Sequence, residues 1–252
     1  MCLIIASRNG SVVTDSELLK AYRANPDGWG IVWHNGRLLE TRKGFNSSAL
    51  LKAQAAAKGH PYVTHLRWAT HGTINVGNCH PFRVNRKLWM AHNGVLSCVK
   101  IERENRSDTW HLAKLLSNVA PNELYNKSFQ KTLSGVIGMS NKLAFIDINS
   151  TITMINESCG HWVKDIWLSN THSIGAPERR ERFVSRFDQR KWTRHDWERW
   201  AYYDEQDTAS TDTWRDDYYH DTGMCAECGD SGEVFIDPES GLGYCEFCLQ
   251  LF

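Results

Sequence analysis

Met1-Cys2-Leu3-Ile4-Ile5 opens the chain, and its second residue governs the interpretation of the rest. Cysteine is small enough for the initiating methionine to be removed, so we expect Cys2 to become the first residue of the mature protein. It then carries a thiol and a free α-amine, whose ordinary pKa of about 7.7–8.0 lets it accept a proton near neutral pH. Nucleophiles activated by their own N-terminal amine are a known catalytic solution. A cysteine at this position also occurs by accident, so the prediction depends on the remaining sequence.

Four separated segments place polar residues and glycines at the ends of apolar or helical patterns: Asn25-Pro26-Asp27-Gly28-Trp29-Gly30, Thr64-His65-Leu66-Arg67-Trp68-Ala69-Thr70-His71-Gly72, Met90-Ala91-His92-Asn93-Gly94-Val95-Leu96 and Ser107-Asp108-Thr109. Their order and spacing behind Cys2 resemble the class II glutamine amidotransferase domain, which is of the N-terminal-nucleophile (Ntn) type. The resemblance covers residues 2–175. It is close to a stand-alone subgroup that carries Asp-Gly-Trp-Gly-Ile and His-Pro-Phe, here Asp27 to Ile31 and His80-Pro81-Phe82.

Amide hydrolysis needs a nucleophile, a base, donors for the oxyanion and a clamp on the charged ends of the substrate. Cys2 would supply the thiolate, and its own amine would be the base and later the acid. The resemblance implies that the side-chain amide of Asn93 and the backbone N–H of Gly94 form the oxyanion hole. Such donors are worth about 10²–10³ in rate each.

The resemblance also assigns a substrate site to Arg67, Trp68, Thr70, His71 and Asp108. Arg67 offers a planar fork that suits a bidentate carboxylate contact, here with the α-carboxylate of glutamine. Asp108 would hold the α-ammonium group, and Trp68 would cover the bound substrate. One cation and one anion together indicate recognition of a free amino acid rather than a peptide.

Structural alternatives exist for several of these residues. Arg67 would also serve as a surface ion-pair partner, and Asn93-Gly94 is a strong type I′ hairpin signal. Asp108 also suits the N-cap or first turn of the helix after it. Three histidines are interpreted as structural because Ntn chemistry needs no histidine base: His71, His80 and His92. Three cysteines are expected to be buried free thiols: Cys79, Cys98 and Cys159.

Two positions depart from the family pattern. Synthetases of this class commonly carry Cys-Gly-Ile, whereas Leu3 follows the cysteine here. The Ser-Asp-Thr motif is often followed by Glu, whereas Trp110 follows here. The second departure bears on the shape of the ammonium end of the site.

Composition sets the class of protein. The chain has 252 residues, with 41% hydrophobic and 23% charged residues, as in an ordinary globular protein. Its formal net charge is zero, which indicates neither a nucleic-acid nor a membrane partner for the molecule as a whole. No apolar run approaches 18 residues and no signal peptide is recognised, so we expect a cytoplasmic protein without membrane spans.

The first part of the chain alternates between strand-like and helical patterns. We expect strands at residues 3–6, 30–34, 37–42, 62–69, 87–91, 142–148, 151–156 and 165–169. We expect helices at residues 16–23, 47–57, 109–118 and 126–134. Because several strands are adjacent without a helix between them, antiparallel pairing is favoured. We therefore predict an α+β fold, and the resemblance implies a four-layer αββα Ntn-hydrolase sandwich over residues 2–175.

Residues 176–222 are predicted to be a charged, Trp-rich helix and linker. Residues 178–199 hold eight basic and five acidic side chains, with aromatic residues interleaved, whereas residues 204–221 hold seven acidic side chains and one basic. The basic-aromatic part fits either a helix packed on its own domain or a nucleic-acid contact. The acidic part is typical of a flexible linker.

Residues 223–252 are predicted to be a small zinc-ribbon-like module. Cys225, Cys228, Cys245 and Cys248 form the pattern C-x₂-C-x₁₆-C-x₂-C, the spacing of a tetrahedral zinc site. So short a segment cannot build a core, and the metal would supply its folding energy. Two disulfides or a redox pair are the alternatives, and a cytosolic chain disfavours disulfides. The zinc would be structural, and glutamine hydrolysis would need no cofactor.

The sequence thus predicts an enzyme that releases ammonia from glutamine through a γ-glutamyl thioester. The ammonia would pass to an acceptor that a separate synthetase-like partner activates, because no second catalytic domain is recognised. The alternatives are a stand-alone γ-glutamyl amide hydrolase and a zinc-ribbon binding protein whose Ntn domain is only a scaffold.

Overall fold

The computed structural model describes residues 2–70, 72–174, 234–236 and 243–245. The strands are β1 (Leu3–Ser7), β2 (Trp29–His34), β3 (Leu39–Gly44), β4 (Tyr62–Leu66), β5 (Phe82–Asn85), β6 (Leu88–Asn93), β7 (Lys142–Asp147), β8 (Ile152–Ile155), β9 (His161–Val163), β10 (Ile166–Leu168), β11 (Val234–Ile236) and β12 (Gly243–Cys245). The α-helices are α1 (Asp15–Arg23), α2 (Ser47–Ala57), α3 (Asp108–Leu115), α4 (Pro121–Tyr125) and α5 (Lys127–Ile137).

Two antiparallel sheets form the centre of the molecule. The first has six strands in the order β3-β2-β4-β1-β10-β9, and the second has four in the order β5-β6-β7-β8. Strand β1 lies inside the six-stranded sheet, between β4 and β10. Because both neighbours run antiparallel to β1, their C-terminal ends meet its N-terminal end.

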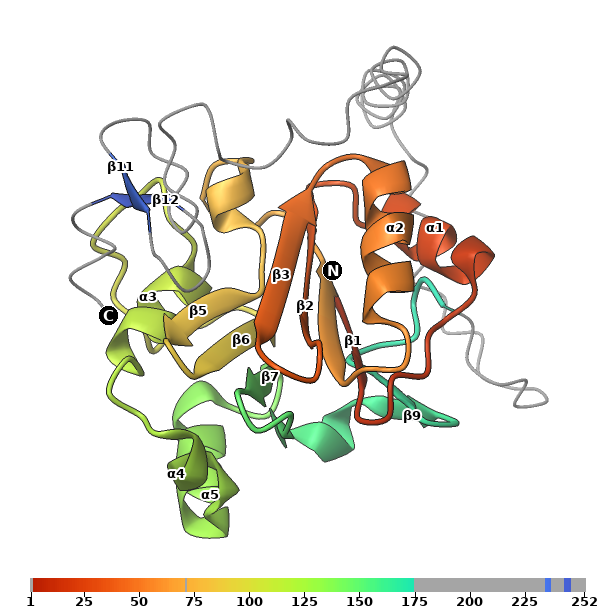
Figure 1. The fold of residues 1–252 in the computed structure, drawn as a ribbon. Coiled ribbons are helices and arrows are strands. Elements are labelled where there is room, and N and C mark those ends of the chain that lie inside the picture. The colour runs from red at the N-terminus through yellow and green to blue at the C-terminus, as the bar shows by residue number, and fades with distance from the viewer. Residues whose placement is uncertain (1, 71, 175–233, 237–242, 246–252) are drawn as a thin grey trace, which may run out of the picture.

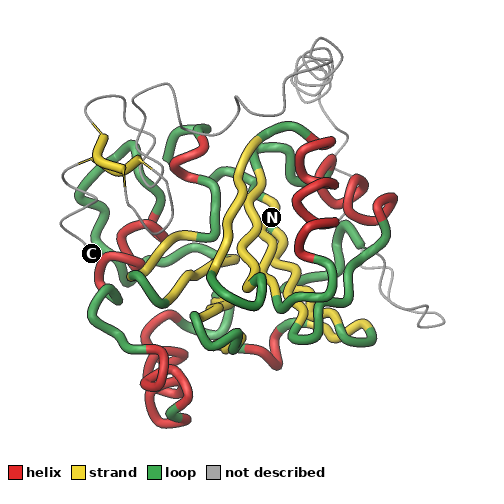
Figure 2. The backbone as a smooth tube through the Cα atoms, viewed as in Figure 1, coloured by secondary structure: helices red, strands yellow, loops and turns green. Residues whose placement is uncertain are grey.

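Helices cover the outer faces of the two sheets, which gives four layers (Figures 1 and 2), and three apolar cores join these layers. One core joins α1 and α2 to the six-stranded sheet, and another joins α3, α4 and α5 to the four-stranded sheet. The third lies between the sheets and includes Ile4, Val63 and Ala144. The expected αββα layering of the first part of the chain is therefore confirmed.

The sequence of β1 explains its central place. Its apolar residues alternate, so Leu3 and Ile5 enter the helix-side core while Ile4 and Ala6 enter the core between the sheets. All five residues of the strand are buried. A run that is apolar on both faces is what a strand covered on both faces requires.

Side-chain caps fix where the longer helices begin. Thr14 and Glu17 form a reciprocal capping box at α1, and Asn46 accepts the Ala49 N–H at α2. Ser107 accepts the Trp110 N–H at α3, and Asn126 caps α5. Such caps satisfy backbone donors that have no partner inside the helix.

The eight strands and four helices expected in residues 2–175 are present, with ends shifted by a few residues. The strand predicted at residues 62–69 ends at Leu66, because the chain leaves the sheet at Arg67 to enter the site described below. Strands β5 and β9 and helix α4 were not predicted. Each of the three has only three to five residues, too few to show a clear periodicity.

Three expectations are corrected. Asn93-Gly94 is not a hairpin turn, because β6 pairs with β5 and β7 and the chain after Gly94 leads through a loop to α3. Cys98 is exposed and Cys159 is partly exposed, so of these three cysteines only Cys79 is a buried thiol. Cys98 lies in a turn and Cys159 ends a short 3-10 helix, and neither belongs to a described core.

Cys225, Cys228 and Cys248 lie outside the described residues, as does the whole segment 176–222. Cys245 ends β12, whose backbone pairs with β11 in a two-stranded sheet. Within the residues that the structure describes, no helix is both long and apolar enough to cross a bilayer.

Candidate active site

Cys2 lies just before β1, where the ends of several strands converge. Arg67 follows the last residue of β4, and Ser169 and Asn170 follow the last residue of β10. From the facing sheet, β6 ends at Asn93. The antiparallel topology thus brings residues from both sheets to the start of β1.

The thiol of Cys2 is half-buried against the backbone of Trp68. The Trp68 N–H donates to Sγ at 3.2 Å, and Sγ donates to the Trp68 carbonyl at 3.3 Å. Burial raises the pKa of the Cys2 thiol, while the Trp68 hydrogen bond, the amino terminus and Arg67 act in the opposite direction. Because burial prevails, this thiol needs a base to become the thiolate.

A tight turn holds Arg67 in place. The Asp27 N–H donates to the Arg67 carbonyl at 3.0 Å, and the Arg67 N–H donates to the Gly28 carbonyl at 2.8 Å. Oδ2 of Asp27 accepts the Ala69 N–H at 2.8 Å. Arg67 is only 3% exposed, so its interpretation as a surface ion-pair residue is wrong.

The two glycines of Asp27-Gly28-Trp29-Gly30 are required by close packing. Gly28 has a φ of +114°, and a Cβ there would lie 2.4 Å from Sγ of Cys79. A Cβ on Gly30 would lie 2.1 Å from the His80 carbonyl oxygen. The motif therefore packs directly against the segment that contains His80-Pro81-Phe82.

Asn93 and Gly94 lie at the end of β6. Asn93 is buried, and its Nδ2 donates to Oγ of Ser169 at 2.8 Å. Gly94 has a φ of +146°, and a Cβ on it would meet Oδ1 of Asn141 at 2.1 Å. Position 94 thus excludes every larger residue, because Asn141 occupies the space that a side chain would need.

Asp108 is the first residue of α3 and is buried. Its Oδ2 accepts the Leu96 N–H at 2.7 Å, and its Oδ1 accepts the Thr109 N–H at 2.7 Å. Ser107, and not Asp108, caps the helix. A carboxylate has about four acceptor positions, so Asp108 keeps capacity for a further donor.

Most of these residues line one narrow cleft, but Asp27 and Asn93 are not among the residues that form its walls. Its walls are formed by Cys2, Arg67, Trp68, Ala69, Thr70, His80, His92, Gly94, Ser107, Asp108 and Thr109. The open volume is about 20 Å³, room for a single water molecule. Trp68 and Thr70 are exposed, so a larger ligand requires movement on that side of the cleft. His71 lies outside the described residues.

His80 and His92 also line the cleft, although the sequence indicated no role for them there. Both are buried, and burial lowers the pKa of each imidazole, so both are neutral at pH 7. Nε2 of His92 lies 2.8 Å from Oδ1 of Asn141, whose Nδ2 donates to the Ile137 carbonyl. Neutral His92 therefore carries its proton on Nε2, and its Nδ1 lies 2.8 Å from the Thr109 hydroxyl, which also lies 3.2 Å from Oδ1 of Asp108.

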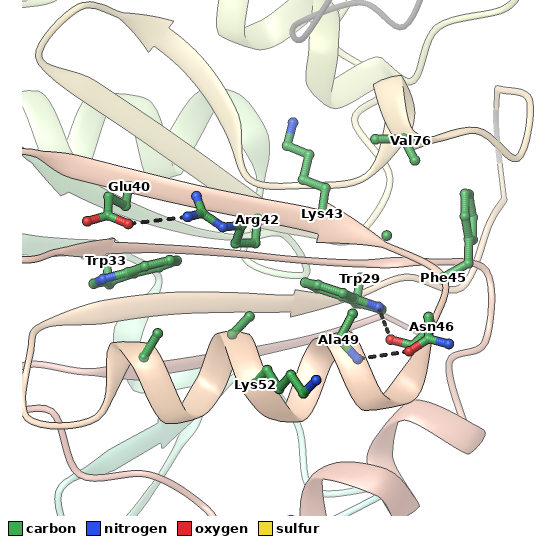
Figure 3. Close-up of a pocket in the computed structure, with 13 residues that line it drawn as sticks. Trp29, Trp33, Glu40, Arg42, Lys43, Phe45, Asn46, Ala49, Lys52 and Val76 are labelled. Atoms are coloured by element: carbon green, nitrogen blue, oxygen red, sulfur yellow. Dashed lines mark hydrogen bonds and ion pairs between the residues drawn. The ribbon is translucent and has the colours of Figure 1, made fainter. Parts of the chain in front are cut away.

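A larger hollow lies on the other side of the six-stranded sheet, between β3 and α2 (Figure 3). It holds about 490 Å³, and Trp29, Trp33 and Arg42 are among its lining residues. Arg42 pairs with Glu40 and lies over the Trp33 ring at 5.5 Å. The described residues that line this hollow include no cysteine, serine or histidine.

Comparison with known proteins identifies the domain. Residues 16–111 match the family model described as glutamine amidotransferases class-II. The chain contains a class II glutamine amidotransferase domain. The matched range includes Arg67, Asn93 and Asp108, whereas Cys2 and Asn170 lie outside it.

Individual relatives of this amidotransferase domain match over only part of their own length. The chain is 30% identical over 152 residues to glutamine–fructose-6-phosphate aminotransferase (isomerizing) of Bartonella henselae, covering 52% of this chain and 25% of the relative. It is 38% identical over 84 residues to the putative glutamine amidotransferase YafJ of Escherichia coli, covering 29% of this chain and 32% of the relative. The chain thus spans about a quarter to a third of these relatives.

Solved structures show weaker likenesses. Glutamine phosphoribosylpyrophosphate amidotransferase from B. subtilis matches with a TM-score of 0.45 and 20% identity, over 67% of this chain and 41% of that one. A class-II glutamine aminotransferase domain protein from Silicibacter pomeroyi matches with a TM-score of 0.32 and 15% identity, over 59% of this chain and 73% of that one.

The described part of the chain holds no cluster of three or more histidine, cysteine or acidic side chains placed to bind a metal. The predicted cysteine ligands fall outside that part, with the side chain of Cys245 among them. The zinc site therefore stays a prediction from the sequence.

Proposed function

We propose that this chain hydrolyses the side-chain amide of glutamine with Cys2 as the nucleophile. The observation that carries the proposal is the convergence of a thiol, a buried guanidinium, a glycine backbone and a buried carboxylate on one cleft. These are the group types that hydrolysis of an amino-acid amide requires. The family match over residues 16–111 supports the same reaction.

Binding would use the two buried charges. Arg67 would take the α-carboxylate of glutamine and Asp108 its α-ammonium group, each with opposite charge and with a fixed position. A buried charge that lacks its counterpart is costly, so a ligand without either end would bind poorly. Trp68 and Thr70 would close over the substrate after it enters.

In the first half-reaction, the α-amine of Cys2 takes the thiol proton and the thiolate attacks the side-chain carbonyl carbon. The second N–H of Asn93 Nδ2 and the Gly94 N–H would stabilise the oxyanion. Collapse breaks the C–N bond, the ammonium of Cys2 returns its proton to the leaving nitrogen, and ammonia departs. Water then attacks the γ-glutamyl thioester with the same amine as base and releases glutamate.

The raised pKa of the thiol supports the need for the amine. With Met1 present, the amine lies one residue further away, about 3.8 Å along the chain. The proposal therefore requires that Met1 be absent from the active protein.

The test is ammonia release from glutamine by the purified chain, compared with Cys2→Ala. We expect the variant to lose activity completely. Cys98→Ala is the matched control, because Cys98 is an exposed free thiol that does not line the cleft, and it should retain full activity. Equal activity in Cys2→Ala and the parent protein would overturn the proposal.

We further propose that the ammonia serves an acceptor activated by a separate protein. The Bartonella relative is named for transfer to fructose 6-phosphate, and this chain spans a quarter of that protein. Copurification from the native source, followed by glutamine-dependent amidation assays with the recovered partner, tests this. Amidation by this chain alone would contradict it.

A further inference from the structure

Two side chains at the end of β10 contact the residues of the proposed reaction centre. Oγ of Ser169 accepts the Ile4 N–H and Nδ2 of Asn93, both at 2.8 Å. Nδ2 of Asn170 donates to the Cys2 carbonyl at 2.7 Å. Ser169 and Asn170 are 1% and 9% exposed, so water does not compete freely for these bonds.

The orientation of the Asn170 amide is fixed from its other side. Its Oδ1 accepts the His172 N–H at 3.2 Å, and a backbone N–H is only a donor. Nδ2 must therefore face the Cys2 carbonyl, which is only an acceptor. The amide cannot be flipped without losing both hydrogen bonds.

The bond from Asn170 holds the end of the Cys2–Leu3 peptide that the sheet does not hold. Ladder pairing of β1 begins at Leu3, opposite Leu66, so it does not hold Cys2 itself. A hydrogen bond on the Cys2 carbonyl fixes the plane of the Cys2–Leu3 peptide, and the Cα of Cys2 lies in that plane. With this Cα in place, the α-amine, the Cβ and Sγ move only by rotation about the Cα–C and Cα–Cβ bonds.

The Ser169 hydroxyl joins the two sheets at the same place. Ile4 belongs to β1 in the six-stranded sheet, whereas Asn93 ends β6 in the four-stranded sheet. A single oxygen thus sets the distance between the strand that bears the nucleophile and the amide that would receive the oxyanion. It occupies one of the two Asn93 N–H groups and leaves the other for that oxyanion.

We propose that Ser169 and Asn170 are positioning residues, which hold the oxyanion donor and the N-terminal nucleophile in register without touching the substrate. This inference rests on the proposed glutamine hydrolysis. Its physical basis is the steep dependence of rate on geometry, in which a misplacement of about 1 Å costs about 10²-fold.

The experiment compares Ser169→Ala and Asn170→Asp with the parent protein in full-length form. Asn170→Asp keeps the shape but cannot donate to the Cys2 carbonyl. Ser173→Ala is the matched control, because Ser173 is a buried serine of the same segment whose hydroxyl has no hydrogen-bond partner among the described residues. The measurements are kcat and KM for glutamine, and the pH dependence of Cys2 alkylation by iodoacetamide, followed on the Cys2 peptide.

We expect both variants to lower kcat by about 10–100-fold. KM should stay within about twofold, because Arg67 and Asp108 are untouched. Asn170→Asp should also change the pH profile of Cys2 alkylation, whereas Ser169→Ala should leave it unchanged. Ser169→Thr, which keeps the hydroxyl, should recover part of kcat, and Ser173→Ala should match the parent.

A kcat for Ser169→Ala equal to that of Ser173→Ala, or losses confined to KM, would overturn the inference. So would an unchanged alkylation profile in Asn170→Asp. Rates are expressed per alkylatable Cys2, so reduced folded yield does not imitate the effect. If the parent protein itself releases no ammonia, the proposed function fails instead, and the alkylation profile still tests the Asn170 contact.

Discussion

At the scale of single residues, substitutions in the substrate-binding site and in the oxyanion site should change different kinetic constants of glutamine hydrolysis. Arg67→Lys keeps the charge but loses the fork, so we expect KM for glutamine to rise at least about tenfold. Asn93→Ala removes a donor that acts on the developing oxyanion, so kcat should fall about 10²–10³-fold with KM little changed. Steady-state kinetics of both variants checks this. A pure KM effect in Asn93→Ala would remove that residue from the oxyanion site.

His65 gives a residue-scale prediction about pH. It is fully buried beside His80, with ring centroids 4.1 Å apart, and neither ring nitrogen has a partner among the described residues. Burial lowers its pKa well below the ordinary 6.5, with Arg67 and His92 adding repulsion. Below pH 6.5 the unfolded chain therefore binds a proton at His65, whereas the folded protein does not. The contribution of His65 to the free energy of unfolding is thus fully present above pH 6.5 and is lost as the pH falls below that value.

Replacing His65 with Leu should remove one such contribution. Between about pH 6 and pH 5 the free energy of unfolding should fall less steeply in the variant than in the parent protein. The two slopes should differ by about 1.4 kcal/mol per pH unit. Urea unfolding at both pH values measures this, with His161→Leu on exposed β9 as control. Identical slopes for the parent and His65→Leu would contradict the buried neutral imidazole.

At the scale of elements, some glycines are required because no side chain fits at their position, whereas others could be replaced by alanine. Gly30 in β2 has no room for a Cβ, so Gly30→Ala should cost about 1–3 kcal/mol. Gly135 lies inside α5, and a Cβ on it would have no neighbour within 4 Å, so Gly135→Ala should add about 0.5–1 kcal/mol. Denaturant unfolding of the two variants should shift the midpoint in opposite directions. A stabilised Gly30→Ala variant would contradict the close packing of β2 against His80.

Elements also show how far the sequence predicts the structure. Elements with a continuous apolar run or many helix-favouring residues, such as β1 and α2, were predicted closely. Arg67, Asn93 and Asp108 were predicted from local motifs and the family resemblance, and Arg67 and Asp108 line the cleft. Ser169 and Asn170 were missed because their partners lie 76 to 168 residues away, and only the pairing of β10 with β1 brings them together. A short polar pair directly after a strand was the available signal.

At the scale of the whole molecule, the αββα body and the C-terminal cysteine module should be separable in function. All residues proposed for chemistry precede residue 175, and the three described cores are built from residues before that position. We expect one zinc ion per chain, bound by Cys225, Cys228, Cys245 and Cys248. Cys225→Ser should release it while kcat/KM for glutamine hydrolysis stays within about twofold. Metal analysis of freshly purified, reduced protein checks the first part, and absence of zinc would refute the site.

A covalent label, read by intact mass and peptide mapping, tests the proposed chemistry of Cys2 most directly. A glutamine analogue with a diazo ketone in place of the side-chain amide should be held by Arg67 and Asp108 and alkylate the nearby thiol. We predict one adduct per chain, on Cys2, in protein that has lost Met1, with protection by excess glutamine. An adduct on another cysteine, or full glutamine-protected labelling of protein that retains Met1, would contradict this mechanism.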